Sequence, residues 1–230
     1  MCASGLAFEP TPFSDSRRSD LIGRRVRHLE NECLMAEISF VERYARGETP
    51  WDSATPSAEM VRILDAGKLT GKTVLEIGCG TGTNAVELAR RGFQVTAVDF
   101  VGQAIRAARK KARDTKVKVD FRLADILNDD PGGPFDILFD RGVYHCLRME
   151  NLKGFQDFLK RATRSGSSWL SLAGNAREQR DGEGPPVVHE HEIRAELGPL
   201  FDILELREFR FSSDKSNLRP LAWSILMRRK

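Results

Sequence analysis

The sequence predicts an α/β protein with a seven-stranded, mostly parallel sheet, an antiparallel last strand, helices on both faces of the sheet and an N-terminal helical extension. From Lys72 onward, short apolar runs alternate with helical patterns, as in folds that join parallel strands by crossover helices. The last two apolar runs are joined by a polar link, residues 212–220, which is too short for a helical crossover, so these strands are expected to pair antiparallel. A separate helical period lies before residue 41 and predicts the extension.

Each strand is expected where aliphatic and aromatic residues gather in a short run. The strands are predicted at residues 73–78, 94–99, 119–125, 135–140, 167–174, 201–211 and 221–229. Helices are predicted at residues 83–92, 102–112, 152–162 and 189–197, where apolar side chains recur at three- and four-residue spacing. A shorter helix is expected after Thr55, which would cap it, with Pro56 in the first helical position.

The residues before the sheet are predicted to form a helical extension and a loop. One helical face carries Ile22, Val26, Leu29, Cys33, Ala36 and Phe40. A loop rich in Gly, Pro, Ser and Thr follows at residues 47–56 and holds Trp51. We therefore expect two parts, an extension over residues 1–70 and a core over residues 71–230.

Composition limits the classes of partner. Apolar residues make up 40% of the 230 residues and charged residues 30%, which is the balance of a globular protein with a substantial core. The net charge of +3 is too small to favour a nucleic-acid partner. The longest apolar run, near Leu221 to Met227, is too short for a membrane helix, so no membrane partner is expected. The four cysteines form no CxxC pair and no secretory signal is evident, so we expect a cytoplasmic protein. We also expect a monomer or a weak homodimer.

The sharpest local signal is a glycine loop at residues 74–82, Val-Leu-Glu-Ile-Gly-Cys-Gly-Thr-Gly. A buried strand runs directly into Gly78, Gly80 and Gly82, and a helix follows. Glycines at these positions allow a tight turn and let a ligand approach the main chain. A nucleotide-binding Walker loop would need Gly-Lys-Ser/Thr, which is absent, and the spacing also differs from the GxGxxG of dinucleotide-binding proteins.

Two acidic residues follow at strand ends. Asp99 ends the second strand, 17 residues after Gly82, where a carboxylate can accept both hydroxyls of a ribose. Asp125 ends the third strand, where a carboxylate can accept from the exocyclic amine of adenine. Either acid alone is also compatible with an ordinary cap of the next helix. Together with the glycine loop, they indicate a nucleoside site.

With these motifs, the sequence from about Phe40 to Lys230 resembles the class I S-adenosylmethionine-dependent methyltransferases, which have a Rossmann-like fold. The resemblance implies S-adenosylmethionine as cofactor, S-adenosylhomocysteine as product, and the glycines under the methionyl part. Asp99 would hold the ribose, and Asp125 with Ile126 the adenine. The residues expected at the cofactor are Trp51, Glu76, Gly78, Cys79, Gly80, Thr81, Gly82, Asp99, Phe100, Asp125, Ile126 and Asp140.

Within that superfamily, the sequence is similar to the thiopurine and thiol S-methyltransferase group. The matching stretches are residues 43–52 (RYARGETPWD), the Asp-Arg-Gly at residues 140–142, and the Gly-Pro-Pro loop that begins at Gly184. The resemblance implies that the first stretch folds over the cofactor as a lid and places Trp51 near the methionine part. The group commonly has Gly where this chain has Ala54.

The resemblance suggests a small-molecule acceptor, most simply a thiol or another chalcogen. Arg141, at the end of the fourth strand, is expected to orient an anionic or thiol acceptor, or else to form a structural ion pair. His145 follows with Tyr144 on the same predicted loop, and is either a general base for a phenol or amine or part of the pocket wall. His189 and His191 are expected to diverge at a helix start, so no metal site is predicted.

Two alternatives stay open at this point. One is an O- or N-methyltransferase of a small metabolite, and the other is a non-catalytic cofactor-binding protein on the same fold. A nucleic-acid methyltransferase is disfavoured, because the fourth strand lacks the Asn/Asp-Pro-Pro-Tyr motif of amino methylation.

Overall fold

The computed structural model describes residues 40–178, 186–214, 217 and 219–230. Nearly all of the predicted N-terminal helical stripe, and most of the Gly-Pro-Pro loop, lie outside these described residues. Residues Val41–Lys230 form one compact unit. The division between residues 70 and 71 stays a prediction.

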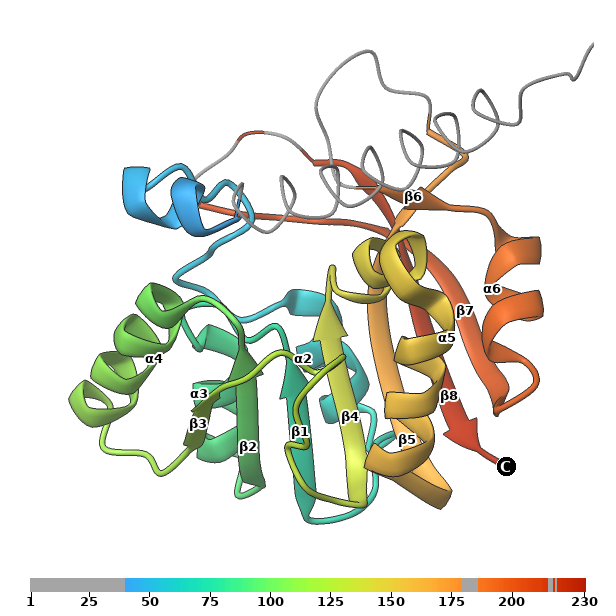
Figure 1. Cartoon of the computed structure of the whole chain (residues 1–230), viewed down its shortest axis with the longest axis horizontal. Coiled ribbons are helices and arrows are strands. Elements are labelled where there is room, and N and C mark those ends of the chain that lie inside the picture. The colour runs from blue at the N-terminus through green and yellow to red at the C-terminus, as the bar shows by residue number, and fades with distance from the viewer. Residues whose placement is uncertain (1–39, 179–185, 215–216, 218) are drawn as a thin grey trace, which may run out of the picture. The chain divides into compact units, whose positions relative to one another are not determined.

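Within the described residues, the sheet contains eight strands in the order β3-β2-β1-β4-β5-β8-β7, with β6 paired to β5 off this path (Figure 1). Their bounds are β1 Thr73–Ile77, β2 Gln94–Asp99, β3 Asp120–Leu123, β4 Phe135–Arg141, β5 Thr163–Asn175, β6 Val187–Val188, β7 Phe201–Arg210 and β8 Leu221–Arg229. The two-residue strand β6 is an addition to the seven predicted strands.

The pairing confirms the predicted sheet. The pairs β1–β2, β1–β4, β2–β3 and β4–β5 are all parallel, whereas β8 is antiparallel to both β5 and β7. The short link between β7 and β8 accounts for this reversal, because it cannot carry a helix across the sheet.

Helices cover both faces of the sheet, as predicted. They are α2 Ala58–Asp65, α3 Thr83–Arg90, α4 Gly102–Asp114, α5 Tyr144–Ala162 and α6 Glu190–Leu197, and residues 40–46 are also helical. In Figure 1, α5 lies in front of the sheet, and α2 and α3 lie behind it. Each face has its own apolar cluster, and alternate residues of one strand separate them: Val74 joins the cluster of α2, α3 and α4, and Leu75 joins that of α5 and α6.

Two helix starts differ from the prediction. Tyr144 and His145 lie on the first turn of α5 and not on a loop, because the carboxylate of Asp140 accepts the backbone N–H groups of Val143 and Tyr144 and starts the helix there. The predicted start near residue 152 reflects a break in the helical backbone at Asn151 (φ −153°, ψ 76°).

The start of α2 is also shifted. Ser57, and not Thr55, is its cap: the Ser57 hydroxyl accepts from the Met60 backbone N–H at 3.5 Å. Thr55 instead belongs to the preceding loop, where its hydroxyl lies 3.0 Å from that of Ser53.

The strand order reverses at β1, which has β2 on one side and β4 on the other. In such a sheet, the connections after these strands leave to opposite faces, and a crevice opens outside their carboxyl ends. The glycine loop follows β1 at this edge, so the fold places it where ligands of open α/β sheets bind.

Candidate active site

The glycine loop between β1 and α3 turns through three left-handed residues. Gly78, Gly80 and Gly82 have φ of 63°, 54° and 78°, values that favour glycine. A Cβ atom on Gly78 would lie 2.3 Å from the Val143 side chain, and one on Gly80 would lie 3.0 Å from the Tyr44 hydroxyl. Gly78 and Gly80 therefore have no space for a side chain, and Gly80 faces the Tyr44 hydroxyl.

Gly82 has a different neighbourhood. A Cβ atom there would lie 2.8 Å from Ala108 in α4 and 2.9 Å from the ring of Phe121 in β3. Gly82 thus allows close packing between the loop, α4 and the sheet, and it does not line the cavity described next.

A cavity of about 60 Å³ lies at the carboxyl ends of β1 and β4. Seven residues predicted from the sequence line it together: Trp51, Glu76, Gly78, Cys79, Gly80, Thr81 and Arg141. It is also lined by residues that sequence reasoning missed, which are Tyr44, Asp52, Ser53, Thr55, Ser57, Thr83, Asn84 and Ser212. The structure therefore joins the strand-end motif to residues 44–57 and to the link between β7 and β8.

Glu76 is the buried acid of this cavity. Its side chain is 2% exposed, and its Oε2 atom has no hydrogen-bond partner among the described residues. Burial raises the pKa of Glu76 to about 8, although a hydrogen bond from the Asn84 side chain opposes this. An unpartnered carboxylate oxygen in a cavity wall is suited to accept a cationic N–H donor.

Asp99 lies beside the loop at the end of β2. Its Oδ2 accepts the Gly80 N–H at 2.8 Å, and its Oδ1 accepts the Val101 N–H at 2.9 Å. Burial raises the pKa of Asp99, and these backbone hydrogen bonds oppose the rise. The carboxylate thus braces the glycine loop against the start of α4, and each oxygen keeps a lone pair for a further donor.

The predicted adenine residues lie outside the cavity. Asp125 accepts the Leu127 N–H at 3.0 Å and so closes its own turn. Ile126 is buried at 6% exposure, whereas Phe100, after β2, is 43% exposed. Asp125 and Ile126 follow β3, and Phe100 follows β2. None of the three lines the cavity that contains Glu76.

Asp140 is turned into the protein. Its carboxylate is fully buried and accepts from the backbone of Val143 and Tyr144 and, at 3.0 Å, from Trp169 Nε1. Burial raises the pKa of Asp140 to about 6. The described contacts therefore assign Asp140 to the start of α5, and it does not line the cavity.

Arg141 binds main chain where the sequence predicted an acceptor or an ion pair. Its Nη1 donates to the Trp51 carbonyl at 2.8 Å, and its Nη2 donates to the Ser212 carbonyl at 2.9 Å. Its guanidinium also lies 4.9 Å from the ring centroid of Phe211. Burial lowers the pKa of Arg141, and the nearby Asp52 opposes this. Arg141 ties two segments to β4 while it lines the cavity.

Tyr144 and His145 do not reach the cavity. The Tyr144 hydroxyl donates to Glu196 Oε2 at 2.7 Å, within the apolar cluster of α5 and α6. His145 Nδ1 accepts the Gly174 N–H at 2.7 Å, so a neutral ring carries its proton on Nε2 and is a donor there. This hydrogen bond occupies the nitrogen that a general base would need free.

A pair of aromatic residues lies over the glycine loop. Trp51 Nε1 donates to the Tyr44 hydroxyl at 3.3 Å, with the two rings edge to face. Arg43 lies 4.8 Å from the Trp51 ring centroid, and Gln103 of α4 donates to the Tyr44 carbonyl at 2.9 Å. Tyr44 and Trp51 both belong to the RYARGETPWD stretch, so this shared motif could have predicted Tyr44 as a residue of the cavity.

Residues 43–56 contain Trp51, and we call them the cover segment. This segment is hydrogen-bonded to the glycine loop and to the first residue of α3. Thr81 Oγ1 donates to Asp52 Oδ1 at 2.6 Å, and Thr83 Oγ1 donates to the Ser53 carbonyl at 2.6 Å. Lys111 of α4 reaches the same point and donates to Thr81 Oγ1 at 2.9 Å.

The link between β7 and β8 holds the cover segment from the other side. Ser213 Oγ donates to the Asp52 carbonyl at 2.8 Å, and Asp214 accepts the Ala54 N–H at 2.8 Å. Ala54 thus takes part through its main chain, which does not require the glycine common in the thiol methyltransferase group.

The described residues contain no cluster of three or more His, Cys, Asp or Glu side chains placed to hold a metal ion. His189 and His191 do not diverge as predicted, since their rings stack with centroids 5.3 Å apart. In the part of the chain that the structure describes, no helix combines the length and apolar character needed to cross a membrane.

Comparison with known proteins identifies a domain family in part of the chain. Residues 74–166 match the methyltransferase domain family. These residues include β1, the glycine loop and the strand-end acids described above. Residues 74–166 are thus a methyltransferase domain, and the chain is similar in sequence and fold to class I S-adenosylmethionine-dependent methyltransferases.

Individual relatives agree with this class. The 2-heptyl-1-hydroxyquinolin-4(1H)-one methyltransferase of Mycobacteroides abscessus is 32% identical over 148 residues, which is 63% of this chain and 65% of the relative, just under two thirds of its length.

Two solved structures share the fold. One comes from work on the conversion of a disulfide bond into a thioacetal group during echinomycin biosynthesis; it has a TM-score of 0.69 and 27% identity, and the match covers 79% of this chain and 84% of that chain. The magnesium protoporphyrin IX methyltransferase of Synechocystis, with bound S-adenosylmethionine, has a TM-score of 0.58 and 20% identity, with 74% and 76% covered.

Proposed function

We propose that this protein transfers the methyl group of S-adenosylmethionine to a small-molecule acceptor. The observation that carries this proposal is the unpartnered Oε2 of buried Glu76, in a cavity wall beside Gly80, whose main chain has no side chain to keep a ligand away. A cationic amine can pair with this carboxylate while the ligand lies against the glycine loop, and the methionyl part of the cofactor carries such an amine.

The other cofactor contacts follow from the strand order. Asp99 has lone pairs left for the ribose hydroxyls, and Asp125, Ile126 and Phe100 lie farther along the same edge, toward β3, where the adenine would extend. S-adenosylmethionine supplies a methyl group already activated by a sulfonium charge. The protein therefore needs mainly to align the acceptor with that methyl group and to exclude water.

The cover segment is suited to exclude water. Trp51 and Tyr44 lie over the loop, and hydrogen bonds from Arg141, Thr81 and Ser213 hold the segment at Trp51 and Asp52. In this proposal Arg141 positions the cover, and its unused N–H groups face an acceptor in the cavity that it lines.

For the acceptor, we favour a thiol or another chalcogen. A thiol has a reference pKa near 8.5, so about a few per cent is thiolate at neutral pH without a base. This suits a cavity in which the described lining contains no histidine or lysine. The solved structure that shares 27% identity comes from work on sulfur chemistry, the conversion of a disulfide bond into a thioacetal group.

An acidic hydroxyl is the second candidate. The name of the Mycobacteroides relative gives its substrate a hydroxyl group on a quinolone. Such an acceptor also needs little help from a base when it is already partly ionised, so the same cavity chemistry applies.

The test is incubation of the full chain with methyl-labelled S-adenosylmethionine and a panel of thiols, selenols, acidic hydroxyl compounds, phenols and amines, followed by mass spectrometry of the products. The proposal predicts that at least one thiol yields a labelled thioether. Glu76→Gln is the control, because its affinity for the cofactor should be reduced. Label only on hydroxyl compounds would select the second candidate. Cofactor binding without any methylated product would instead support the non-catalytic alternative.

A further inference from the structure

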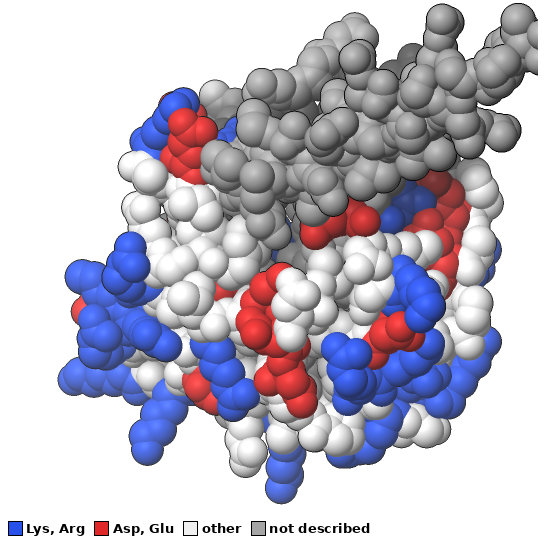
Figure 2. All heavy atoms as spheres, viewed as in Figure 1, with Lys and Arg blue, Asp and Glu red and all other residues white. Residues whose placement is uncertain are grey.

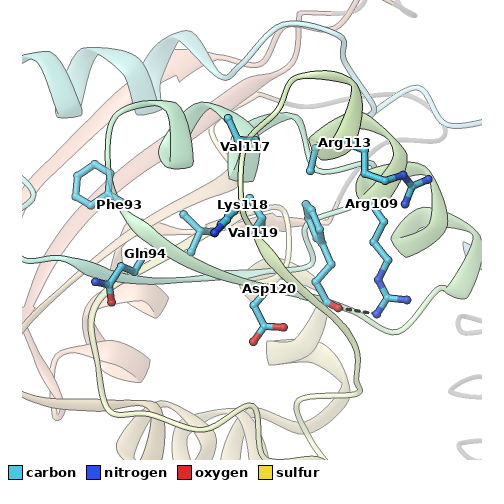
Figure 3. Close-up of a pocket in the computed structure, with 11 residues that line it drawn as sticks. Phe93, Gln94, Arg109, Arg113, Val117, Lys118, Val119 and Asp120 are labelled. Carbon is cyan, nitrogen blue, oxygen red and sulfur yellow. Dashed lines mark hydrogen bonds between the residues drawn. The ribbon is translucent and has the colours of Figure 1, made fainter.

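A larger groove lies away from the cavity, at the amino ends of β2 and β3 (Figure 3). It is formed by the starts of these two strands, the last turns of α4 and the connection from α4 to β3. Its volume is about 600 Å³, which is within the range of sites for small molecules. None of the residues proposed to bind the cofactor lines it.

The floor of the groove is apolar and closely packed. Val95, Ala112 and Phe121 are each 5–6% exposed, and half-buried Val117 and Val119 extend the apolar surface toward the rim. Phe121 is held by the glycine loop, since its ring would lie 2.9 Å from a Cβ atom on Gly82. The floor is therefore preformed, and a ligand would not have to open it.

The rim of the groove is cationic. Arg109, Arg113 and Lys118 line it, and none of the three makes an ion pair with any of the described acids. Arg109 donates one N–H to the Phe121 carbonyl at 2.7 Å, which is the dashed line in Figure 3. The acid at the rim, Asp120, pairs with Arg122 at 2.6 Å.

The surrounding surface has the same sign. Figure 2 shows Lys and Arg gathered over α4, at the left of the view. Besides the rim residues, α4 and the turn after it carry Arg106, Lys110 and Lys116, of which Lys110 pairs with Asp114.

We infer that this groove is a second binding site, for an amphipathic anion: an aliphatic chain or ring system that carries a carboxylate, a sulfonate or a similar group. The apolar part would cover Val95, Ala112 and Phe121, and the anionic group would lie between Arg113 and Lys118. An uncharged apolar ligand would leave the cations unmatched. An anion without an apolar part would leave the floor in water.

The experiment is calorimetric titration of the full chain with octanoate, and in parallel with 1-octanol and acetate. Octanoate is expected to bind one to one, and each of the other two about tenfold more weakly or less, because each supplies only half of the contact. Each titration is run with and without S-adenosylhomocysteine. The groove lies apart from the cavity, so octanoate affinity should be the same in both conditions, whether or not the cofactor proposal holds.

Two double variants locate the site. Arg113→Glu with Lys118→Glu reverses the rim charges, and Arg106→Glu with Lys116→Glu makes the same change in net charge on α4 and its following turn outside the groove. The first should weaken octanoate binding about tenfold, and the second less than about twofold. All four side chains are exposed, so neither variant should unfold the protein. Equal losses in both variants, equal binding of 1-octanol and octanoate, or the absence of saturable octanoate binding would each overturn the inference.

Discussion

At the scale of single residues, the surroundings of Glu76 indicate the chemistry of the ligand. Glu76 lies one residue before the end of the buried strand β1, one of its carboxylate oxygens has no partner among the described residues, and burial raises its pKa to about 8. In the free protein, ionisation of this group is unfavourable, because no cation in the described structure contacts its Oε2 atom. A bound amine would reverse this, which makes the acid responsive to the presence of cofactor.

Glu76→Gln tests this reading through the pH dependence of stability. The pKa in the folded protein, about 8, is above the reference value of 4.5, so the folded state binds more protons than the unfolded state between these values. Wild-type stability should therefore fall as the pH rises from 4.5 to 8, and the glutamine variant should lack this loss. Thermal unfolding without ligand should show the variant relatively more stable at pH 8 than at pH 5.

The same variant should bind the cofactor less tightly. Loss of a charge-assisted hydrogen bond costs about 1.5–3 kcal/mol, so affinity for S-adenosylhomocysteine should fall roughly tenfold or more. If wild type and variant show the same dependence of stability on pH and the same affinity for S-adenosylhomocysteine, Glu76 does not bind the cofactor amine.

Asp99 braces the glycine loop and, in the proposed function, also holds the ribose of the cofactor. Asp99→Ala removes the proposed ribose contact and also the brace to Gly80 and Val101, so cofactor affinity should fall by about 2 kcal/mol, with a smaller loss of stability. Asp99→Asn keeps an amide oxygen for one backbone N–H and serves as the matched control. Calorimetry with S-adenosylhomocysteine measures the effect, and an unchanged affinity in Asp99→Ala would exclude the ribose assignment.

At the scale of elements, the cover segment connects parts that are far apart in the chain. It begins within the helix of residues 40–46, contacts the glycine loop through Thr81 and α3 through Thr83, and contacts the link between β7 and β8 through Ser213. Arg141 of β4 donates to both the cover segment and that link, so a single side chain holds their main chains together.

Arg141→Lys should loosen the cover segment while the sheet remains folded. Lysine is a single-point donor on a flexible stem, so it cannot reproduce the two N–H groups that reach the Trp51 and Ser212 carbonyls in a fixed fork. Limited proteolysis near Gly47 should become faster in the variant without ligand and slower when S-adenosylhomocysteine is added. Trp51 fluorescence should follow the same change, with Trp51→Phe to subtract the background of the other tryptophans.

Arg164→Lys is the control, because Arg164 is exposed and pairs with Asp136 at the opposite end of β4. If Arg141→Lys and the control are cleaved equally slowly, with and without ligand, Trp51 is an anchor of the N-terminal segment and the cover proposal fails.

At the scale of the whole molecule, α2 is joined to the far edge of the sheet by buried charge. Glu59 is 5% exposed and accepts from Arg62 at 2.7 Å and from Arg207 of β7 at 3.1 Å. Arg62 in turn pairs with Glu205 of β7. This network joins residues predicted to belong to the extension to the last strand pair.

Glu59→Ala should lower the free energy of unfolding by about 2–3 kcal/mol, because it leaves Arg62 and Arg207 without their shared carboxylate. Burial acts to raise the pKa of Glu59, but the hydrogen bonds from Arg62 and the charge of Arg207 lower it overall. With a depressed pKa, the stabilisation is present above the unfolded pKa and lost as the pH falls through the folded pKa. Urea unfolding should therefore show a large wild-type–variant difference at pH 7 and a smaller one near pH 3; a difference that does not change with pH would refute the ionic origin.

The sequence alone determined the parts of this protein that depend on local pattern. Alternating apolar runs and helical periods predicted the mostly parallel sheet, the antiparallel last strand and the helices on both faces, because each strand and helix must bury an apolar surface. The glycine loop and Glu76 could likewise be predicted, since they belong to one continuous motif at the end of one strand, residues 74–82.

Only the tertiary structure decided what lies opposite that loop. Asp140, Arg141, Tyr144 and His145 are close in sequence, yet only Arg141 lines the cavity. Asp140 and Arg141 are successive residues of β4 and so point to opposite sides of the strand, whereas Tyr144 and His145 lie on the first turn of α5, where their side chains bond to Glu196 and Gly174. Tyr44 and Ser212 line the same cavity from distant parts of the chain. No local pattern encodes such contacts, since they depend on how the cover segment and the link between β7 and β8 pack across the carboxyl ends of the strands.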